Sequence, residues 1–179
     1  MPNSLHQRCL VHVCRNLIAK VPTHAQGEVK GDYWAIFDQI EHDGEAAVAE
    51  GRRRAKRFIA KWVPLYPAAV ACVADNLDPL LVHLLFPAEH HKRIRHSNLI
   101  ERTFGETRRR VKVIGRLPGE QSCLSLVWAV LDRASKGWRG LTMTPKALRR
   151  LQDLRREVLR ERPELPGEEG VAETVTTAA

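Results

Sequence analysis

The sequence lacks any long apolar run. No stretch reaches the ~20 consecutive apolar residues that a membrane-spanning helix needs, and residues 1–6 (Met-Pro-Asn-Ser-Leu-His) lack the apolar segment of a secretory signal. These absences predict a cytoplasmic protein without a membrane partner. Aromatic residues are also scarce, at 6% of the 179 residues, which disfavours a platform for stacking single-stranded bases.

Cysteine is rare and scattered. The four cysteines are Cys9, Cys14, Cys72 and Cys123, and without an export signal reduced thiols are expected. A zinc site made of Cys9, His12 and Cys14 is disfavoured, because zinc sites usually combine paired ligand motifs, and the sequence has no second Cys-x-x-Cys or His-x-x-x-His pair. A plain buried thiol is the alternative for Cys9.

Basic residues are absent from positions 163–179, which hold four glutamates together with proline and glycine, so we expect a disordered acidic tail there. The preceding 162 residues contain all 29 Lys and Arg against 17 acidic residues, a net charge of +12. The charge is concentrated in residues 52–61, 102–116 and 146–162. A basic body suits a polyanion such as nucleic acid, and solvated helix faces are the alternative.

The spacing of apolar residues is mainly helical, with a 44% apolar fraction that can support a core. Residues 5–13 mix apolar and polar positions and predict one short strand. One strand cannot form a sheet, which suggests that part of a fold is missing. Helices are predicted at residues 46–63, 70–77, 80–85, from about 98, 123–138 and 145–161.

The segment 94–104 holds the sharpest signal, because Asn98 or Ser97 can cap a helix whose first turn contains Glu101. Two interpretations stay open for Glu101. Asn98-x-x-Glu101 resembles a capping box, in which the glutamate reaches back to the cap N–H, and the same residue is a candidate catalytic carboxylate. The run Arg108-Arg109-Arg110 is likewise either a solvated face or a phosphate clamp.

Four motifs in order resemble the mutator-type transposases of bacterial insertion sequences, over about residues 6–141. They are Arg-Cys-Leu-Val-His-Val-Cys-Arg-Asn at 8–16, Trp-Val-Pro-Leu-Tyr-Pro at 62–67, Phe-Pro-Ala-Glu-His-His at 86–91 and Asn-Leu-Ile-Glu-Arg-Thr-Phe at 98–104. A tryptophan near the end of the family's domain matches Trp138.

The resemblance implies a fold that is mainly α, the C-terminal fragment of an RNase H-like (α/β) catalytic core with a helical insertion and at most one or two strands. Residues 1–14 would be the last strand region of that core, and residues 15–93 the helical insertion. Residues 94–162 would hold the catalytic-glutamate helix and the C-terminal helices, followed by the tail at 163–179.

The resemblance also implies DDE chemistry, in which two aspartates and a glutamate hold two Mg²⁺ (or Mn²⁺) ions for DNA strand cleavage and transfer. Glu101 matches the catalytic, metal-binding glutamate, and Arg108, Arg109, Arg110 and Lys112 would contact phosphates. The implied partners are double-stranded DNA, at terminal inverted repeats and target sites, and a second copy in a homodimer, in the bacterial nucleoid. The family-signature residues whose role stays open are Cys9, His12, Arg15, Asn16 and Asn98.

The two catalytic aspartates of the family lie upstream of the Arg-Cys-x-x-His segment, with which this chain begins. We therefore expect a truncated or split reading frame whose product is inactive alone. Two alternatives remain: a non-catalytic basic helical module that binds DNA or regulates a transposase, and a decaying remnant. The aspartates that match no catalytic position are Asp32, Asp38, Asp43, Asp75 and Asp78.

Overall fold

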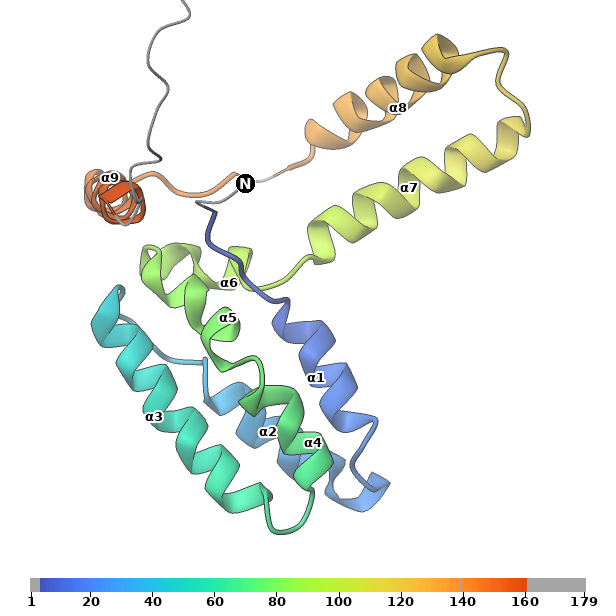
Figure 1. The fold of residues 1–179 in the computed structure, drawn as a ribbon. Helices are drawn as coiled ribbons and strands as arrows, with labels where there is room; N and C mark the ends of the chain where they lie inside the picture. The colour runs from blue at the N-terminus through green and yellow to red at the C-terminus, as the bar shows by residue number, and fades with distance from the viewer. Residues whose placement is uncertain (1–3, 139, 161–179) are drawn as a thin grey trace, which may run out of the picture.

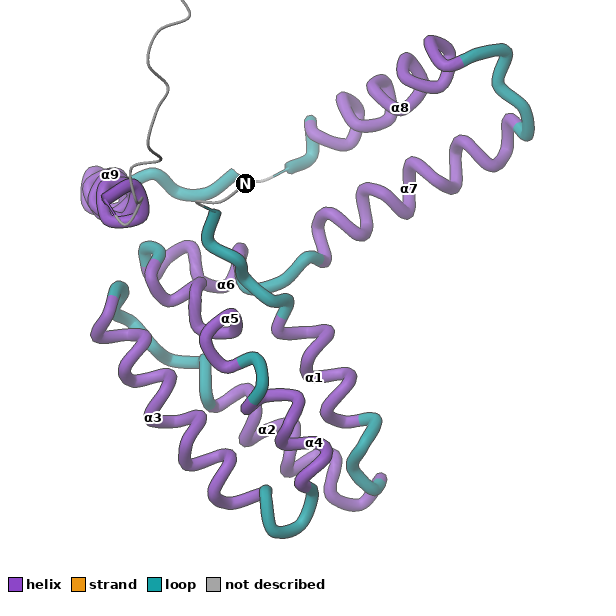
Figure 2. Tube along the Cα trace, viewed as in Figure 1, coloured by secondary structure: helices purple, strands orange, loops and turns teal. Residues whose placement is uncertain are grey.

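Helices make up all the regular structure of the computed structural model, which describes residues 4–138 and 140–160; no strand occurs in these residues (Figure 2). The α-helices are α1 (Leu10–Ile18), α2 (Gln26–Ala35), α3 (Glu45–Trp62), α4 (Pro67–Ala74), α5 (Leu77–Leu81), α6 (His91–Ile94), α7 (Asn98–Ile114), α8 (Glu120–Ser135) and α9 (Pro145–Arg160). Short 3₁₀ turns are η1 (Thr23–Ala25), η2 (Val82–Leu85) and η3 (Ala88–His90). The mainly α prediction is confirmed.

The short strand predicted at residues 5–13 is wrong, because α1 begins at Leu10. The residues that α1 buries are Leu10, Val13, Cys14 and Leu17. Their separations of three, one and three residues match one face of an α-helix rather than alternate sides of a strand. Helical packing of that face therefore prevails over the partial alternation in the sequence.

Helices α1 to α6, which we call the bundle, pack around one core (Figure 1). Tyr33 of α2 lies at its centre with no exposed surface, and its hydroxyl donates to the carbonyl of Leu10 at 2.9 Å. Its ring makes edge-on contacts with Phe37 and Phe58, with ring centroids 5.3 and 6.4 Å away. These contacts fix α1, α2 and α3 against one another, because such aromatic pairs add to the burial of apolar area.

Helix α3 approaches α5 and η2 closely at Gly51. A methyl group at Gly51 would lie 2.7 Å from Leu81 and 2.8 Å from Leu84, closer than carbon atoms pack. Both leucines are buried, with Leu84 fully so. The absence of a side chain at Gly51 therefore sets the distance between these elements.

Helices α7 and α8, which we call the hairpin, run antiparallel and extend away from the bundle (Figure 1). Gly115, with a φ of 72°, follows α7 and begins the turn. The hairpin buries few side chains, and Phe104 and Trp128 are 62% and 69% exposed. The helix predicted from about 98 is confirmed, and the one predicted at 123–138 is found three residues earlier, at Glu120–Ser135.

Helix α9 begins at Pro145, as predicted. Hydrogen bonds connect α9 and the segment before it to the end of the bundle. The Arg150 guanidinium donates through Nε to the carbonyl of Leu85 at 3.0 Å, and a ring nitrogen of His90 lies 2.8 Å from the carbonyl oxygen of Thr142. The predicted acidic tail, residues 163–179, lies outside the described residues.

Among the described residues no single helix is long and apolar enough to cross a membrane. Helix α4 and the segment Leu77–Leu85 reach that length only as a pair, which is bent by 66°. Both parts contribute buried residues to the core of the bundle.

Candidate functional site

The loop between α6 and α7 is joined to the start of α1 by one backbone hydrogen bond and one hydrogen bond from a backbone N–H to a cysteine sulfur. The N–H of Leu10 donates to the carbonyl of Arg95 at 3.0 Å, and the N–H of Ser97 donates to Sγ of Cys9 at 3.4 Å. Arg95 is itself held by an ion pair with Asp38 at 2.8 Å. The first turn of α1 and the first turn of α7 are therefore neighbours, although about 90 residues separate them in the sequence.

Three chemically active side chains meet at this junction. The Sγ of Cys9, a ring nitrogen of His12 and a carboxylate oxygen of Glu101 all lie within 4.8 Å of one another. Nε2 of His12 is 3.5 Å from Oε1 of Glu101, and both side chains are nearly half exposed. The Ser97 hydroxyl donates a short hydrogen bond to the same carboxylate oxygen. We call Cys9, His12 and Glu101 the junction cluster.

The capping-box interpretation of Glu101 is wrong. Helix α7 begins at Asn98, so Ser97 is the cap residue, and Glu101 lies one position beyond the glutamate of a capping box. The N–H of Glu101 donates to the carbonyl of Ser97 at 2.9 Å, while the carboxylate accepts from the Ser97 hydroxyl and faces His12. The carboxylate is thus directed toward the junction and is reachable from solvent.

The thiol of Cys9 is polarised toward its ionised form. Partial burial alone would raise its pKa, but hydrogen bonds from Ser97 and His12 outweigh that and lower the pKa from 9.0 to about 7. Cys9 also precedes the first residue of α1, and a helix N-terminus favours a thiolate. The plain buried thiol is instead Cys14, whose pKa is raised by burial.

The four predicted phosphate-contacting residues are all exposed on α7, but they are not equivalent. Arg109 and Arg110 both bind the Glu106 carboxylate, at 2.9 and 2.8 Å, and the bonds from Arg109 and then Arg110 lower the pKa of Glu106. Within the described residues Arg108 and Lys112 have no ion-pair partner. These two cations are therefore free to meet an external anion.

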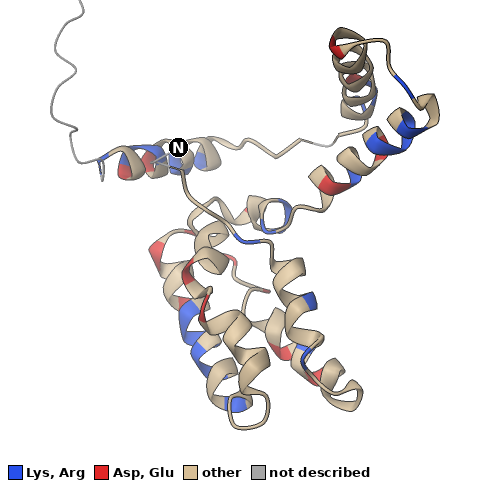
Figure 3. Cartoon of the chain, turned by 45° about the vertical axis from the view of Figure 1, so that its right-hand side comes forward, with Lys and Arg blue, Asp and Glu red and all other residues tan. Residues whose placement is uncertain are grey.

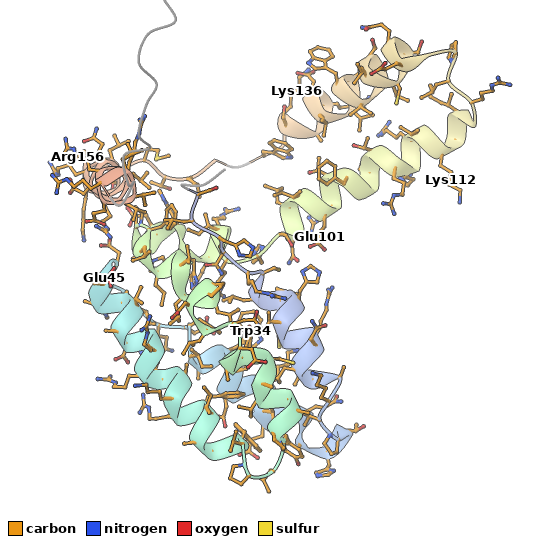
Figure 4. The ribbon with its side chains drawn as sticks, in the orientation of Figure 1. Trp34, Glu45, Glu101, Lys112, Lys136 and Arg156 are labelled. Atoms are coloured by element: carbon orange, nitrogen blue, oxygen red, sulfur yellow. The ribbon has the colours of Figure 1, made fainter. Side chains whose placement is uncertain are left out.

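Glu101, Arg108 and Lys112 lie in a row along one face of α7. Seven and eleven residues separate the two cations from Glu101, which is close to two and three whole turns of 3.6 residues. At a rise of 1.5 Å per residue, the row is about 16 Å long. Glu101 and Lys112 lie toward opposite ends of α7 in Figure 4, and Figure 3 shows the basic residues along this helix.

Comparison with known proteins identifies the family. Residues 1–140 match the model of the Mutator family of transposases, which is most of the chain. The chain belongs to this transposase family.

Three transposases of bacterial insertion sequences are similar to this chain, in agreement with the family match. The chain is 28% identical over 138 residues to the transposase for insertion sequence element ISRM5 of Rhizobium meliloti (strain 1021), a match that covers 77% of this chain and 33% of the relative. It is 33% identical over 141 residues to the transposase for insertion sequence element IS6120 of Mycolicibacterium smegmatis, a match that covers 78% of this chain and 42% of the relative. It is 30% identical over 151 residues to the transposase for insertion sequence element IST2 of Acidithiobacillus ferrooxidans, a match that covers 82% of this chain and 48% of the relative. This transposase chain therefore spans between a third and a half of the length of these relatives.

The remaining signature residues of this Mutator-family chain do not join the junction cluster. Arg15 and Asn16 are exposed on α1, and Asn98 is exposed at the start of α7. Sequence reasoning missed Ser97, which hydrogen-bonds both Cys9 and Glu101. Its signal in the sequence is a hydroxyl residue directly before Asn98, a pattern that predicts a helix cap and no further contact.

The junction cluster does not by itself fit the Mg²⁺ pair expected for a mutator transposase. Mg²⁺ prefers oxygen ligands, and two ions need several carboxylates, whereas among the described residues Glu101 is the single carboxylate of the cluster. Asp32, Asp38 and Asp78 instead pair with Lys61, Arg95 and Arg52 on the bundle. Among the described residues, Glu101 is therefore the one carboxylate that this cluster could offer to a magnesium ion.

Proposed function

We propose that this chain provides the catalytic glutamate and a phosphate-contacting helix to a DDE-type transposase with an RNase H-like core. Such an enzyme cuts and joins DNA at terminal inverted repeats by metal-dependent transesterification. The observation that carries the proposal is the row on α7, where an accessible Glu101 carboxylate lies in line with the free cations Arg108 and Lys112. Metal-dependent phosphoryl transfer on DNA uses carboxylates that hold the metal ions and cations that contact the phosphates, and both residue types occur along this row.

The magnesium ions would need two further carboxylates besides Glu101, and we propose that other residues of the complete transposase supply them. When bound, such ions activate the attacking oxygen and stabilise the leaving one. In this chain Ser97 and His12 hold the carboxylate of Glu101 in place, and Arg108 and Lys112 position the DNA backbone. With a single carboxylate at the junction, this chain alone is not expected to cleave DNA.

The exposed apolar side chains of the hairpin support the idea that more of the core packs there. Phe104, Leu124 and Trp128 are each more than half exposed. Large exposed apolar surfaces mark sites of interaction. We propose that the RNase H-like sheet of the complete enzyme covers the hairpin, which would place Glu101 next to the remaining carboxylates.

The test of catalysis is Glu101→Gln in a transposase assembled from this chain and the segment that carries the two aspartates. Strand cleavage of inverted-repeat DNA should fall below detection, because the amide removes a charged ligand, while DNA binding persists. Glu106→Gln, on the same helix and with the same change of charge, is the matched control and should still cleave. Cleavage retained by Glu101→Gln would contradict the assignment.

The test of DNA contact uses this chain and a gel-shift titration at several salt concentrations. Arg108→Ala with Lys112→Ala should weaken binding to duplex DNA and make the slope of log K against log salt shallower by about 2, since each lost phosphate contact removes about 0.9. The control pair Arg109→Ala with Arg110→Ala has the same net charge but lies on other faces of α7. Equal effects of the two pairs would show that total charge, not the row, governs binding.

A second candidate is a non-catalytic module that binds DNA or dampens a full-length transposase. It is favoured by the presence of a single carboxylate in the junction cluster. It predicts that Glu101→Gln leaves DNA binding unchanged and that no cleavage appears when the segment with the two aspartates is supplied. Cleavage in that assembly would eliminate this candidate.

A further inference from the structure

The side chains of the junction cluster offer three different kinds of metal-ligand atom, whereas magnesium ions bind mainly to oxygen atoms. The three atoms are a thiol sulfur, an imidazole nitrogen and a carboxylate oxygen, from Cys9, His12 and Glu101. Thiolate and imidazole ligands favour zinc and similar transition metals, whereas Mg²⁺ favours oxygen. We propose that the junction cluster binds one transition-metal ion of the zinc type, with a fourth position open to water or a ligand.

The spacing of the donors supports a tetrahedral ion. Zinc bonds of about 2.0–2.3 Å at tetrahedral angles place neighbouring donor atoms about 3.3–3.8 Å apart. Nε2 of His12 and Oε1 of Glu101 are 3.5 Å apart, and no pair of donor atoms exceeds 4.8 Å. Movements of about an ångström would therefore bring the three donors to the spacing of a tetrahedral site.

The backbone explains why these donors converge. Cys9 directly precedes α1 and His12 lies three residues later, so both side chains project from the same side of the helix start. Glu101 lies in the first turn of α7, directly after the loop that the hydrogen bond from Leu10 N–H to the carbonyl of Arg95 joins to the start of α1. The site thus joins two segments that are far apart in the sequence, which a motif search within one segment does not detect.

Ser97 supplies the outer contacts that metal ligands usually have. Its N–H donates to Sγ of Cys9 at 3.4 Å, and its hydroxyl donates to Oε1 of Glu101. Such outer hydrogen bonds orient the ligands before the ion arrives. The half-exposed side chains of His12 and Glu101 leave an entry path from solvent.

Glu101 cannot hold this ion and a magnesium ion of the catalytic pair at the same time, so the proposed site belongs to this chain by itself, without the further carboxylates. Its readout is metal binding and not cleavage, so it can fail or succeed independently of the proposed function. Co²⁺ is the probe, since a cobalt–thiolate bond gives a charge-transfer absorption in the near ultraviolet and tetrahedral Co²⁺ absorbs in the visible. The metal-free 179-residue chain should bind one Co²⁺ with both signatures. Zn²⁺ should displace the cobalt, and a large excess of Mg²⁺ should not.

Variants locate the site. Cys9→Ser should abolish the charge-transfer band, and His12→Asn and Glu101→Gln should each weaken Co²⁺ binding by about tenfold or more. Cys123→Ser and His24→Asn are the controls, since both residues lie outside the cluster, and both should bind like the parent chain. No charge-transfer band in the parent, or a band that survives Cys9→Ser, would overturn the site.

A second measurement avoids any folding defect in the variants. The parent chain is alkylated with iodoacetamide, with and without Zn²⁺, and each cysteine is followed by peptide mass spectrometry. Zn²⁺ should slow the alkylation of Cys9 by about tenfold or more, because a metal-bound thiolate is a poorer nucleophile, and should leave Cys123 unchanged. Equal alkylation rates of Cys9 in the two conditions would refute the proposal.

Discussion

The bundle and the hairpin are both built from helices, but they differ in how far their apolar side chains are buried. In the bundle, Leu10, Tyr33 and Leu84 are fully buried, whereas in the hairpin Phe104 and Trp128 are 62% and 69% exposed. Helical periodicity therefore specifies a helix but not its burial. The bundle carries its own core, and the hairpin presents apolar surface that its own two helices do not cover.

The largest expected effect compares one leucine from each region. Leu84→Ala should reduce the free energy of unfolding by about 3–4 kcal/mol, because it removes a fully buried side chain and leaves a cavity. Leu124→Ala removes a side chain that is 55% exposed and should cost less than about 1 kcal/mol. Urea unfolding followed by circular dichroism measures both, and equal losses would break the comparison.

Lowering the pH should reduce the free energy of unfolding of the bundle, because His83 is buried in its neutral form. Burial, and then the neighbouring His91, lower the pKa of His83 from 6.5 to about 3. The unfolded chain therefore takes up this proton at a higher pH than the folded chain, so stability falls as pH decreases below 6.5. At about 1.4 kcal/mol per pH unit, the loss at pH 4.5 should be about 2–3 kcal/mol.

Urea unfolding at a series of pH values tests this, with His83→Gln as the variant and the exposed His24→Gln as its control. His83→Gln should flatten the decline below pH 6.5, and His24→Gln should not. Helices α7 and α8 contain no histidine, so the hairpin has no equivalent proton site. A decline that persists unchanged in His83→Gln would refute the assignment to this residue.

A smaller effect compares two helical glycines. Gly51→Ala should lower stability by about 1–2 kcal/mol, because its methyl group would press on Leu81 and Leu84. Gly105→Ala, in α7, meets nothing within 4 Å and should raise helix stability by about 0.5–1 kcal/mol. Thermal melting distinguishes the two, and stabilisation by Gly51→Ala would show that the bundle is looser at this contact.

Much of the fold could be predicted from local pattern. The helix expected at 46–63 is α3, Glu45–Trp62, and the one expected at 145–161 is α9, Pro145–Arg160. Both have repeats of three and four residues and clear ends. The start of α1 was predicted wrongly as a strand, because a short apolar run satisfies both periods and only its packing in the bundle distinguishes them.

Part of the candidate site could also be predicted from the sequence, and part of it could not. Glu101 and the cations of α7 could be selected from the motif and its resemblance to mutator transposases, and their catalytic and DNA-binding roles stay predictions. The sequence analysis considered Cys14 as a partner of Cys9 and His12 in a zinc site and disfavoured that site. In the structure Cys14 is buried in the core, and Glu101 instead lies beside Cys9 and His12. That exchange could not be predicted, because it depends on where α7 meets α1.

The sequence by itself determined the helical class, the ends of α3 and α9 to within one residue, and the row of Glu101, Arg108 and Lys112 on one face of α7. These features follow from backbone hydrogen bonds and side-chain spacing within a few turns. Only the tertiary structure decided that the bundle, and not the hairpin, buries its apolar faces, and that Cys9 and His12 meet Glu101. Contacts across about 90 residues depend on how the whole chain packs, which no local pattern specifies.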